Sequence, residues 1–266
     1  METEQTKKRA DQKIAIYIPA YNAAHTVPLV LDRIPQEIKE KVAEIFVVDN
    51  ASTDDTYLTV IEYKHAKGLH NLKVIRNEKN KGYGGSQKVA YQYCLDKGYD
   101  IVVMLHGDAQ YAPEYLPRLI EPVENGEADF VFGSRMTGNP LKGGMPLWKY
   151  AGNKTLTKME NLVLGTNISE FHSGYRVFSC EALRKVPFQI CSDEYYFDTE
   201  ILIQVHLAGL RMGERTIPTH YGKESMHPSL KHLYKYCSNI ILTMGKYLLH
   251  KKGIKKYKLF EVGREK

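Results

Sequence analysis

Residues 13–19 are KIAIYIP, an apolar run that ends in a turn and predicts a first buried strand. A helix is expected over residues 24–34, and EIFVV at residues 44–48 predicts a second buried strand. The alternation continues, with further strands expected at residues 72–76, 101–105, 129–132, 175–179 and 211–217 and helices over 83–97, 148–164 and 197–208. Strands that alternate with helices of about ten or more residues indicate an α/β domain whose mostly parallel sheet is flanked by helices.

In such a sheet, ligands bind outside the carboxyl ends of the strands. Polar residues follow each of the first four predicted strands, at residues 19–22, 49–50, 76–77 and 106–110. We expect these four segments to lie along one edge of the sheet. Ser52 or Thr53 is the expected N-cap of the helix after the second strand.

The composition is that of an ordinary globular protein of 266 residues, with 43% hydrophobic and 26% charged residues. The net charge of +6 is uneven, because the chain from Lys223 onward carries eleven Lys plus Arg and three Asp plus Glu. That segment is therefore +8 and residues 1–222 are −2, which argues against a nucleic-acid-binding surface on the body. The four cysteines form no CxxC pair, and a reducing, cytoplasmic setting is expected.

Three segments are predicted: a disordered N-terminus (1–12), one domain (13–225) and a basic, amphipathic helical tail (226–266). No run reaches the roughly 18 apolar residues that a membrane-spanning helix needs. The paired lysines at 251–252 and 255–256 predict instead that the tail lies on an anionic membrane at its cytoplasmic face. A solvated terminus, or a packing helix in a homo-oligomer, is the other interpretation of the tail.

Asp108 comes just after the fourth strand, with His106 and Gln110 two residues away on either side. Alternate residues of an extended segment share a face, so these three side chains predict a site for Mg²⁺ or Mn²⁺. The alternative is a structural role, in which Asp108 caps the next helix.

Two further features favour a phosphate-containing ligand. Asp49 is placed to accept hydrogen bonds from a base or ribose, or to form an Asx turn. Residues 80–85, NKGYGG, offer a cation and close backbone approach at a helix start, which suits an anion, although a glycine cluster alone is often only a turn. Residues 136–147, rich in glycine and proline, predict a mobile loop near the site.

Six motifs occur together in one order: IPAYNAA (18–24), VVDNASTDDT (47–56), NKGYGGS (80–86), MLHGDAQYAPE (104–114), FGSRMTG (132–138) and HSGYR (172–176). In this set the chain resembles glycosyltransferase family 2, in the branch of the polyprenol-phosphate mannose and glucose synthases. The resemblance covers residues 13–225 and implies a GT-A fold, an inverting mechanism, a nucleotide-diphosphate sugar donor and a divalent metal.

The resemblance also implies roles for individual residues. Asp108 matches the last Asp of the family's DxD motif and would bind the metal with Gln110, while His106 replaces the first acidic residue. A neutral imidazole still ligates metals. The implied nucleotide-sugar contacts are Pro19, Ala20, Tyr21, Asn22, Asp49, Asn50, Ser52, Asn80, Lys81, Gly82, His106 and Asp108.

On the acceptor side, Arg135 and Arg176 match positions that face a phosphate, with His172 beside them and Lys223 as a further phosphate contact. Asp198, together with Glu200, is the candidate general base for a hydroxyl acceptor, whereas a lipid phosphate is already anionic and needs none. The implied catalytic set is Asp108, Arg135, Arg176 and Asp198.

The expected function is transfer of a sugar from a UDP- or GDP-sugar to a polyprenyl phosphate or another glycan or lipid acceptor. The His106 replacement leaves open a sugar-nucleotide-binding protein with impaired catalysis. A nucleotidyltransferase is disfavoured, because no glycine-rich loop with a basic residue follows the first strand.

Overall fold

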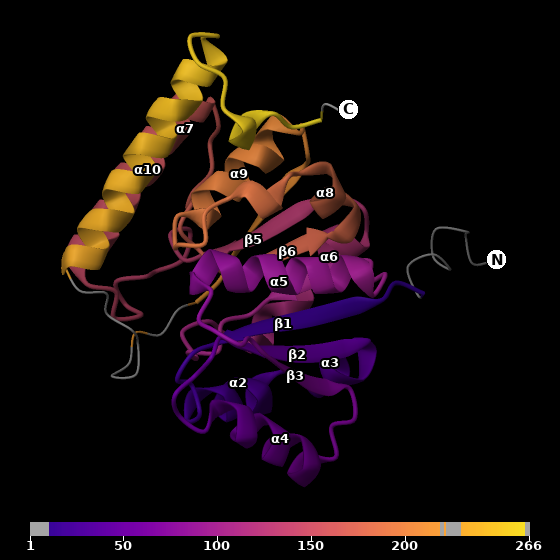
Figure 1. Ribbon diagram of the computed structural model, residues 1–266. Coiled ribbons are helices and arrows are strands. Elements are labelled where there is room, and N and C mark those ends of the chain that lie inside the picture. Colours follow the sequence, from indigo (N-terminus) through magenta and orange to yellow (C-terminus); the bar gives the residue numbers. More distant parts are fainter. Residues whose placement is uncertain (1–10, 219–220, 222–229, 264–266) are drawn as a thin grey trace.

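The computed structural model describes residues 11–218, 221 and 230–263, and these residues form a seven-stranded sheet with helices on both faces (Figure 1). The strand order is β3-β2-β1-β4-β6-β5-β7. The strands are β1 (Ile14–Ala20), β2 (Glu44–Asp49), β3 (Leu72–Arg76), β4 (Ile101–Met104), β5 (Phe130–Ser134), β6 (Arg176–Ser179) and β7 (Met212–Thr216). β6 is antiparallel to β4 and β5, and the other pairs are parallel, which confirms the predicted mostly parallel α/β sheet.

Alternating side chains give each strand two apolar faces. In β1, Ile14, Ile16 and Ile18 pack into one core, whereas Ala15 and Tyr17 pack into the other. The first core is closed by α2 (Thr26–Arg33), α4 (Thr56–Lys67) and α6 (Leu116–Glu124). The second core is closed by α5 (Gly82–Asp96), α8 (Cys180–Lys185), α9 (Phe197–Leu207) and α10 (Leu230–Lys251).

The strand register brings the predicted polar segments to one edge. Ala20 pairs with Asp49, and Asp49 pairs with Arg76, so the carboxyl ends of β1, β2 and β3 are level. Because β6 runs the opposite way, its first residue, Arg176, pairs with Met104 of β4 and Phe132 of β5 at that same edge. The motif that precedes β6 therefore joins the motifs that follow the parallel strands.

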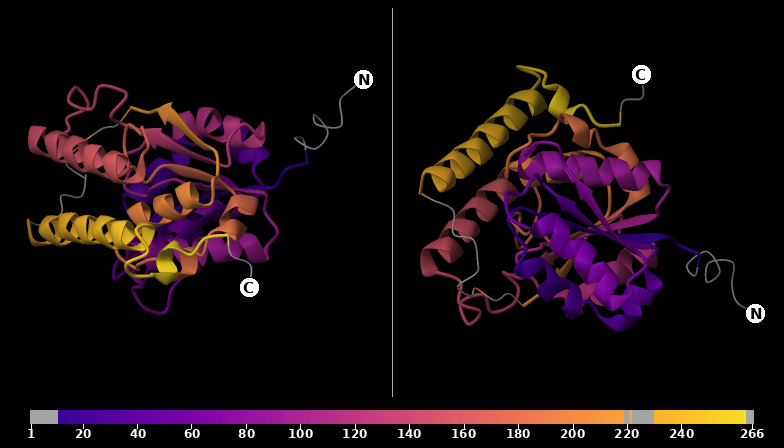
Figure 2. Two further views of the ribbon diagram at one scale, coloured as in Figure 1. Left: turned by 90° about the horizontal axis from the view of Figure 1, so that it is seen from above. Right: turned by 60° about the horizontal axis from the view of Figure 1, so that its bottom comes forward.

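Helices α7 (Leu147–Leu164) and α10 lie side by side at the periphery (Figures 1 and 2). Ile240, Met244 and Tyr247 anchor α10 to the domain, and Phe260 of the short helix η3 (Lys258–Phe260) packs against Tyr247. No helix in the described ranges is long and apolar enough to cross a membrane. The predicted boundary at 225/226 and most of the predicted disordered N-terminus fall outside the residues that the structure describes.

Local predictions differ in their outcome. The expected helix over 24–34 is confirmed by α2, but the separate helix that follows Pro35, α3 (Gln36–Lys41), was not predicted. The predicted N-cap was wrong, because helix α4 begins at Thr56 with Asp55 as its N-cap residue, so neither Ser52 nor Thr53 caps it. The short helices α8 and η2 (Phe188–Ile190) were not predicted, whereas η1 (Pro113–Tyr115) leads directly into α6. Residues 136–144 form turns, as expected for that glycine-rich stretch.

Candidate functional site

Asp49 supplies an open hydrogen-bond acceptor at the end of β2. The side chain is fully buried, and Oδ1 accepts a hydrogen bond from the Ser52 main-chain N–H at 2.9 Å. Oδ2 lies 3.4 Å from Arg76 Nε and has no hydrogen-bond partner in the part of the chain described. Since a buried charged oxygen without a donor is costly, Oδ2 is the atom of this region best prepared to accept a donor from a ligand.

The loops after β1 and β2 hold each other beside Asp49. Asn22, at φ +50°, donates its main-chain N–H to Ser52 Oγ at 2.9 Å and accepts the Thr53 N–H at 2.9 Å. Ala20 is buried and Pro19 half-buried, whereas Tyr21 is 45% exposed and lies free to cover a ligand. Asn22 and Ser52, two of the predicted nucleotide contacts, therefore hold the loops after β1 and β2 together.

Asn50 ties the end of β2 to the segment that leads into α5. Its Nδ2 donates to Asn80 Oδ1 at 3.0 Å and to the Gly82 carbonyl at 3.2 Å. Its Oδ1 accepts the Lys81 main-chain N–H at 3.0 Å. These contacts place Asn50, Asn80 and Gly82 in a structural network that presents Lys81 at the edge of the sheet.

The glycines of the 80–85 segment approach protein backbone, which corrects the expectation of an anion there. The main-chain N–H groups of Gly84 and Gly85 both donate to the carbonyl of Asp193, at 2.8 and 3.3 Å. A Cβ at Gly84 would lie 2.3 Å from the Ser192 carbonyl, and one at Gly82 would lie 2.4 Å from that of Asp193. Glycine is required here so that α5 packs against the loop before α9.

Asp108 and Gln110 offer hard oxygen donors beside the ends of β1 and β4. The extended geometry predicted for residues 106–110 is wrong, because β4 ends at Met104 and Ala109 has φ +59°. In the turn that results, Asp108 Oδ1 accepts the Gln110 main-chain N–H at 3.1 Å and the carboxylate stays half-buried. Within the described residues no three His, Cys, Asp or Glu side chains are arranged to hold a metal ion. One carboxylate and one amide fit a magnesium or manganese ion that takes its other ligands from a diphosphate and water.

His106 is engaged with a neighbouring tyrosine. Its Nε2 lies 3.2 Å from Tyr83 Oη, and a Cβ at Gly174 would lie 2.1 Å from the same nitrogen. Burial lowers the pKa of His106, and the charge of Asp108 opposes this only in part, so the ring is neutral at pH 7. Nε2 is therefore committed to Tyr83 in this structure, which argues against it as a metal ligand.

Asp198 and Arg176 form a buried ion pair beneath His106. Arg176 is 0% exposed, and its Nη1 lies 3.2 Å from Asp198 Oδ1. It also donates to the carbonyls of Ser173, Phe171 and Asp198, at 2.9, 3.2 and 3.3 Å. The expectation that Arg176 faces a phosphate is corrected by this burial, since the guanidinium is enclosed and its contacts are with protein groups.

Both carboxylate oxygens of Asp198 also accept hydrogen bonds from protein groups. Oδ2 accepts from Tyr83 Oη at 3.0 Å, and Oδ1 accepts from Gln87 Nε2 at 3.1 Å. Glu200 is also buried, and its Oε2 accepts the Ser192 main-chain N–H at 2.6 Å. Neither carboxylate is placed as the general base that the sequence suggested, because both hold protein donors.

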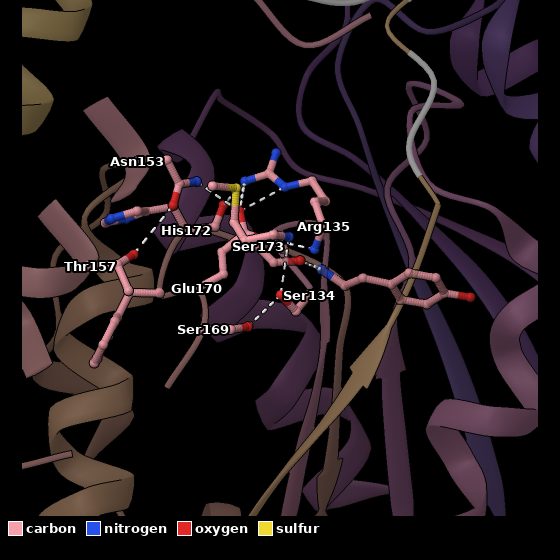
Figure 3. Close-up of polar contacts among 12 residues, drawn as sticks. Ser134, Arg135, Asn153, Thr157, Ser169, Glu170, His172 and Ser173 are labelled. Atoms are coloured by element: carbon pink, nitrogen blue, oxygen red, sulfur yellow. Dashed lines mark hydrogen bonds and ion pairs between the residues drawn. The ribbon is translucent and has the colours of Figure 1, made fainter. Parts of the chain in front are cut away.

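Arg135 is clamped by a carboxylate that the sequence analysis missed (Figure 3). Glu170, fully buried, accepts from the Nε, the Nη2 and the main-chain N–H of Arg135. Nη1 donates to Tyr221 Oη at 3.0 Å, and Nη2 also donates to the His172 carbonyl at 2.9 Å. Burial by itself raises the pKa of Glu170, but Arg135 outweighs it and holds that pKa below its usual range. These bonds use four of the five guanidinium N–H groups, which leaves one for a ligand.

Lys149 is a second cation at this place, also missed from the sequence. It lies in the first turn of α7, with Nζ 4.6 Å from the centre of the Tyr221 ring. Burial and then the charge of Arg135 lower its pKa to about 8, while Asp108 and Glu170 act in the opposite direction. The ammonium group therefore belongs to the same electrostatic cluster as Arg135 and the metal-ligand candidate Asp108.

His172 is buried beside Arg135. Its Nδ1 is 2.8 Å from Tyr236 Oη of α10, and its Nε2 is 3.1 Å from Glu160 Oε2 without the alignment of a hydrogen bond. His172 thus touches protein on both sides, and its carbonyl supports Arg135. Lys223, the other predicted acceptor contact, lies outside the described residues.

Known proteins match this chain over the region that contains the six motifs. Residues 15–187 match the model of glycosyl transferase family 2. The chain is 30% identical to the UDP-N-acetylglucosamine–dolichyl-phosphate N-acetylglucosaminyltransferase of Methanococcus voltae, over 82% of this chain and 89% of the relative. It is 27% identical to the undecaprenyl-phosphate mannosyltransferase of Micrococcus luteus, over 76% of this chain and 81% of the relative.

The fold has solved counterparts. Glucosyl-3-phosphoglycerate synthase from Mycobacterium tuberculosis, in complex with Mn²⁺, UDP and glucosyl-3-phosphoglycerate, superposes with a TM-score of 0.67. The alignment covers 95% of this chain and 84% of that one at 21% sequence identity, which confirms the GT-A architecture. With the family model spanning residues 15–187 and relatives that are polyprenyl-phosphate sugar transferases, the chain belongs to glycosyltransferase family 2 and is a glycosyltransferase.

Proposed function

We propose that this enzyme transfers a sugar, with inversion, from a nucleoside-diphosphate sugar to the phosphate group of a polyprenyl phosphate. The observation that carries the proposal is that Arg135 and Lys149 meet at Tyr221, with Arg135 Nη1 3.0 Å from its hydroxyl oxygen and Lys149 Nζ 4.6 Å from the centre of its ring. Two partly desolvated cations in one cluster suit a phosphate, since each attracts a dianion more strongly there than it would in water. The names of the M. voltae and M. luteus relatives support the same acceptor class.

The carboxylates around this cluster also favour a phosphate acceptor. Glu170 and Asp198 form ion pairs with Arg135 and Arg176, and Glu160 Oε2 lies 3.1 Å from His172 Nε2. A hydroxyl acceptor must lose a proton to a free base, whereas a phosphate oxygen attacks the anomeric carbon without one. As that bond forms, the bond from the anomeric carbon to the diphosphate oxygen breaks, and its electron pair leaves with the nucleoside diphosphate.

On the donor side, Asp49 Oδ2 accepts an N–H of the base, and Tyr21 lies against the nucleoside. Asp108 and Gln110 would hold Mg²⁺ or Mn²⁺, and the ion would supply positive charge near the leaving diphosphate. The solved synthase with this fold carries UDP with Mn²⁺ in one complex and with Mg²⁺ in another, which supports the choice of ion. Lys81, which is exposed, is a further cation on this side of the site, in addition to Arg76.

We further propose that the enzyme works at the cytoplasmic surface of a membrane, where its acceptor is anchored. Ile241, Leu242 and Ile254 are exposed on and just after α10. Lys252, Lys255 and Lys256, close to Ile254 in the sequence, are exposed as well. Apolar side chains flanked by lysines suit the interface of an anionic bilayer.

The first test is calorimetric titration with UDP and with GDP, each with and without Mn²⁺. We expect Mn²⁺ to tighten the binding of one of the two nucleotides, and Asp108→Ala to remove that effect together with sugar transfer. Asp96→Ala, an exposed carboxylate near the end of α5, is the control and should behave as wild type. Metal-dependent nucleotide binding with no turnover on any polyprenyl phosphate would favour the alternative, a sugar-nucleotide-binding protein with impaired catalysis. Near-normal transfer by Asp108→Ala would contradict the assignment of the metal site.

A further inference from the structure

Tyr236 connects helix α10 to the candidate site. Tyr236 Oη lies 2.8 Å from His172 Nδ1, and the two rings meet edge to face with their centroids 5.8 Å apart. The His172 side chain is 7% exposed, so this contact is closed to water. A hydrogen bond formed away from water fixes the ring of His172 in one orientation.

His172 passes that constraint on to Arg135. The carbonyl of His172 accepts from Arg135 Nη2 at 2.9 Å, so the residue that receives α10 also holds the candidate catalytic guanidinium. On its far side, Nε2 of the ring faces Glu160 Oε2 of α7, and Glu160 Oε1 accepts from Thr199 Oγ1 at 3.0 Å. Helices α7 and α10 therefore meet at the imidazole, and α9 supports Glu160 from behind.

The geometry of Arg135 makes its orientation important. Four of its N–H groups are held by Glu170, Tyr221 and His172, and only one remains for a phosphate. A small rotation of the guanidinium would turn that single donor away from the acceptor. Loss of one support is therefore felt in the reaction more than in the fold.

We propose that α10 is a positioning element of the active site, in which Tyr236 orients Arg135 through His172. The inference rests on the proposed transfer to a phosphate, in which Arg135 contacts the acceptor. It assigns the C-terminal helix a part in the chemistry in addition to any part in binding a surface. Tyr236 itself is a positioning residue, because it contacts His172.

Tyr236→Phe tests this with little risk to folding. The substitution removes one hydroxyl group, while Ile240, Met244 and Tyr247 keep α10 anchored. Tyr234→Phe is the matched control, because Tyr234 lies on the same helix and is 77% exposed. Both variants are compared with wild type for kcat, for KM of donor and acceptor, and for hydrogen–deuterium exchange of the main chain over residues 170–176.

For Tyr236→Phe we expect kcat to fall about three- to tenfold, as for the loss of one hydrogen bond, with the KM of the donor unchanged. Exchange over residues 170–176 should rise in this variant and stay at the wild-type level in Tyr234→Phe. His172→Asn, which keeps a polar atom near the place of Nδ1, should retain more activity than His172→Ala.

Equal exchange in the two tyrosine variants overturns the proposal whatever their activities are. Raised exchange with an unchanged kcat overturns it as well, since Arg135 would then not depend on α10. A wild-type enzyme that transfers no sugar to any polyprenyl phosphate contradicts the proposed function alone, because the exchange measurement needs no substrate.

Discussion

The charge of Lys149 depends on pH near neutrality and that of Arg135 does not, although both are cations in the same cluster as Asp108. Burial and the neighbouring guanidinium lower the pKa of Lys149 to about 8, whereas an arginine stays protonated throughout the accessible range. Below pH 8 the free enzyme therefore holds two charges for an incoming phosphate. Above pH 8 it holds one, until a bound dianion raises the pKa of Lys149 again.

We predict that the affinity for a phosphate acceptor falls as pH rises through about 8, because the lysine loses its proton there. Lys149→Arg should move that fall to higher pH, since the guanidinium remains charged. The measurement is the KM of the acceptor between pH 6.5 and 9.5 at constant ionic strength. Superimposable pH profiles for wild type and Lys149→Arg would show that another group controls the loss of acceptor affinity at high pH.

At the scale of single elements, the start of α5 depends on its glycines for packing. Gly84 lies against the loop before α9, where a Cβ would meet the Ser192 carbonyl at 2.3 Å and Phe197 Cβ at 2.7 Å. The obstacle is main chain, which yields less readily than the end of a flexible side chain. Gly152 of α7 has nothing within 4 Å of the place of its Cβ.

Gly84→Ala is therefore expected to lower the free energy of unfolding by about 2 kcal/mol. Gly152→Ala, the same change in an open part of a helix, should leave it unchanged or raise it by up to about 1 kcal/mol. Urea unfolding followed by circular dichroism measures both. If the two variants lose equal stability, the close approach at Gly84 does not matter to folding.

The elements that were predicted correctly are those whose signals are local. The apolar run at 44–48 became β2 almost residue for residue, because a strand buried on both faces needs a continuous apolar sequence. The expected strand at 72–76 became β3 with the same bounds, although it lies at the edge of the sheet with Lys73 and Arg76 exposed. The antiparallel insertion of β6 between β4 and β5 was not predicted, because strand order depends on contacts between distant segments.

The candidate site shows the same difference between local signals, which were recognised, and contacts from distant segments, which were not. Motif spacing identified Asp49 and Asp108 at strand ends, but the partners that saturate Asp198 come from α5 and β6 and leave no pattern around residue 198. Glu170 and Lys149 were missed for this reason, although each flanks a quoted motif or the glycine-rich loop. The available signal was Glu170, a carboxylate two residues before the HSGYR motif, with Arg135 as its distant partner.

For the whole molecule, charge and apolar surface are gathered at the C-terminal end. Lys252, Lys255 and Lys256 are exposed around Ile254, which is 69% exposed. Phe260, a few residues later, is buried against Tyr247. Truncation there would remove part of the core, so substitutions test the proposed membrane contact more cleanly.

Changing Lys252, Lys255 and Lys256 to Glu should weaken binding to vesicles that contain anionic lipid, since each lysine near such a surface contributes about 1 kcal/mol. The control changes three exposed lysines of the N-terminal half, Lys13, Lys79 and Lys97, to Glu and alters the net charge equally. Vesicle flotation at low and moderate salt compares them. An equal loss in both variants would mean that overall charge, and no particular surface, determines binding.

The late position of β6 in the sequence has a consequence for how the chain acquires its structure during synthesis. β1 to β4 are complete by residue 104 and pair with one another along consecutive neighbours in the sheet. Among the described strands, β5, at 130–134, pairs with β6 and β7, both of which leave the ribosome later. The first half of the sheet is therefore able to assemble while β5 waits for a partner for about forty further residues, a few seconds of translation at the usual rate. During that interval an apolar strand with two open edges is exposed, and this is the stage at which a chaperone would have most to protect.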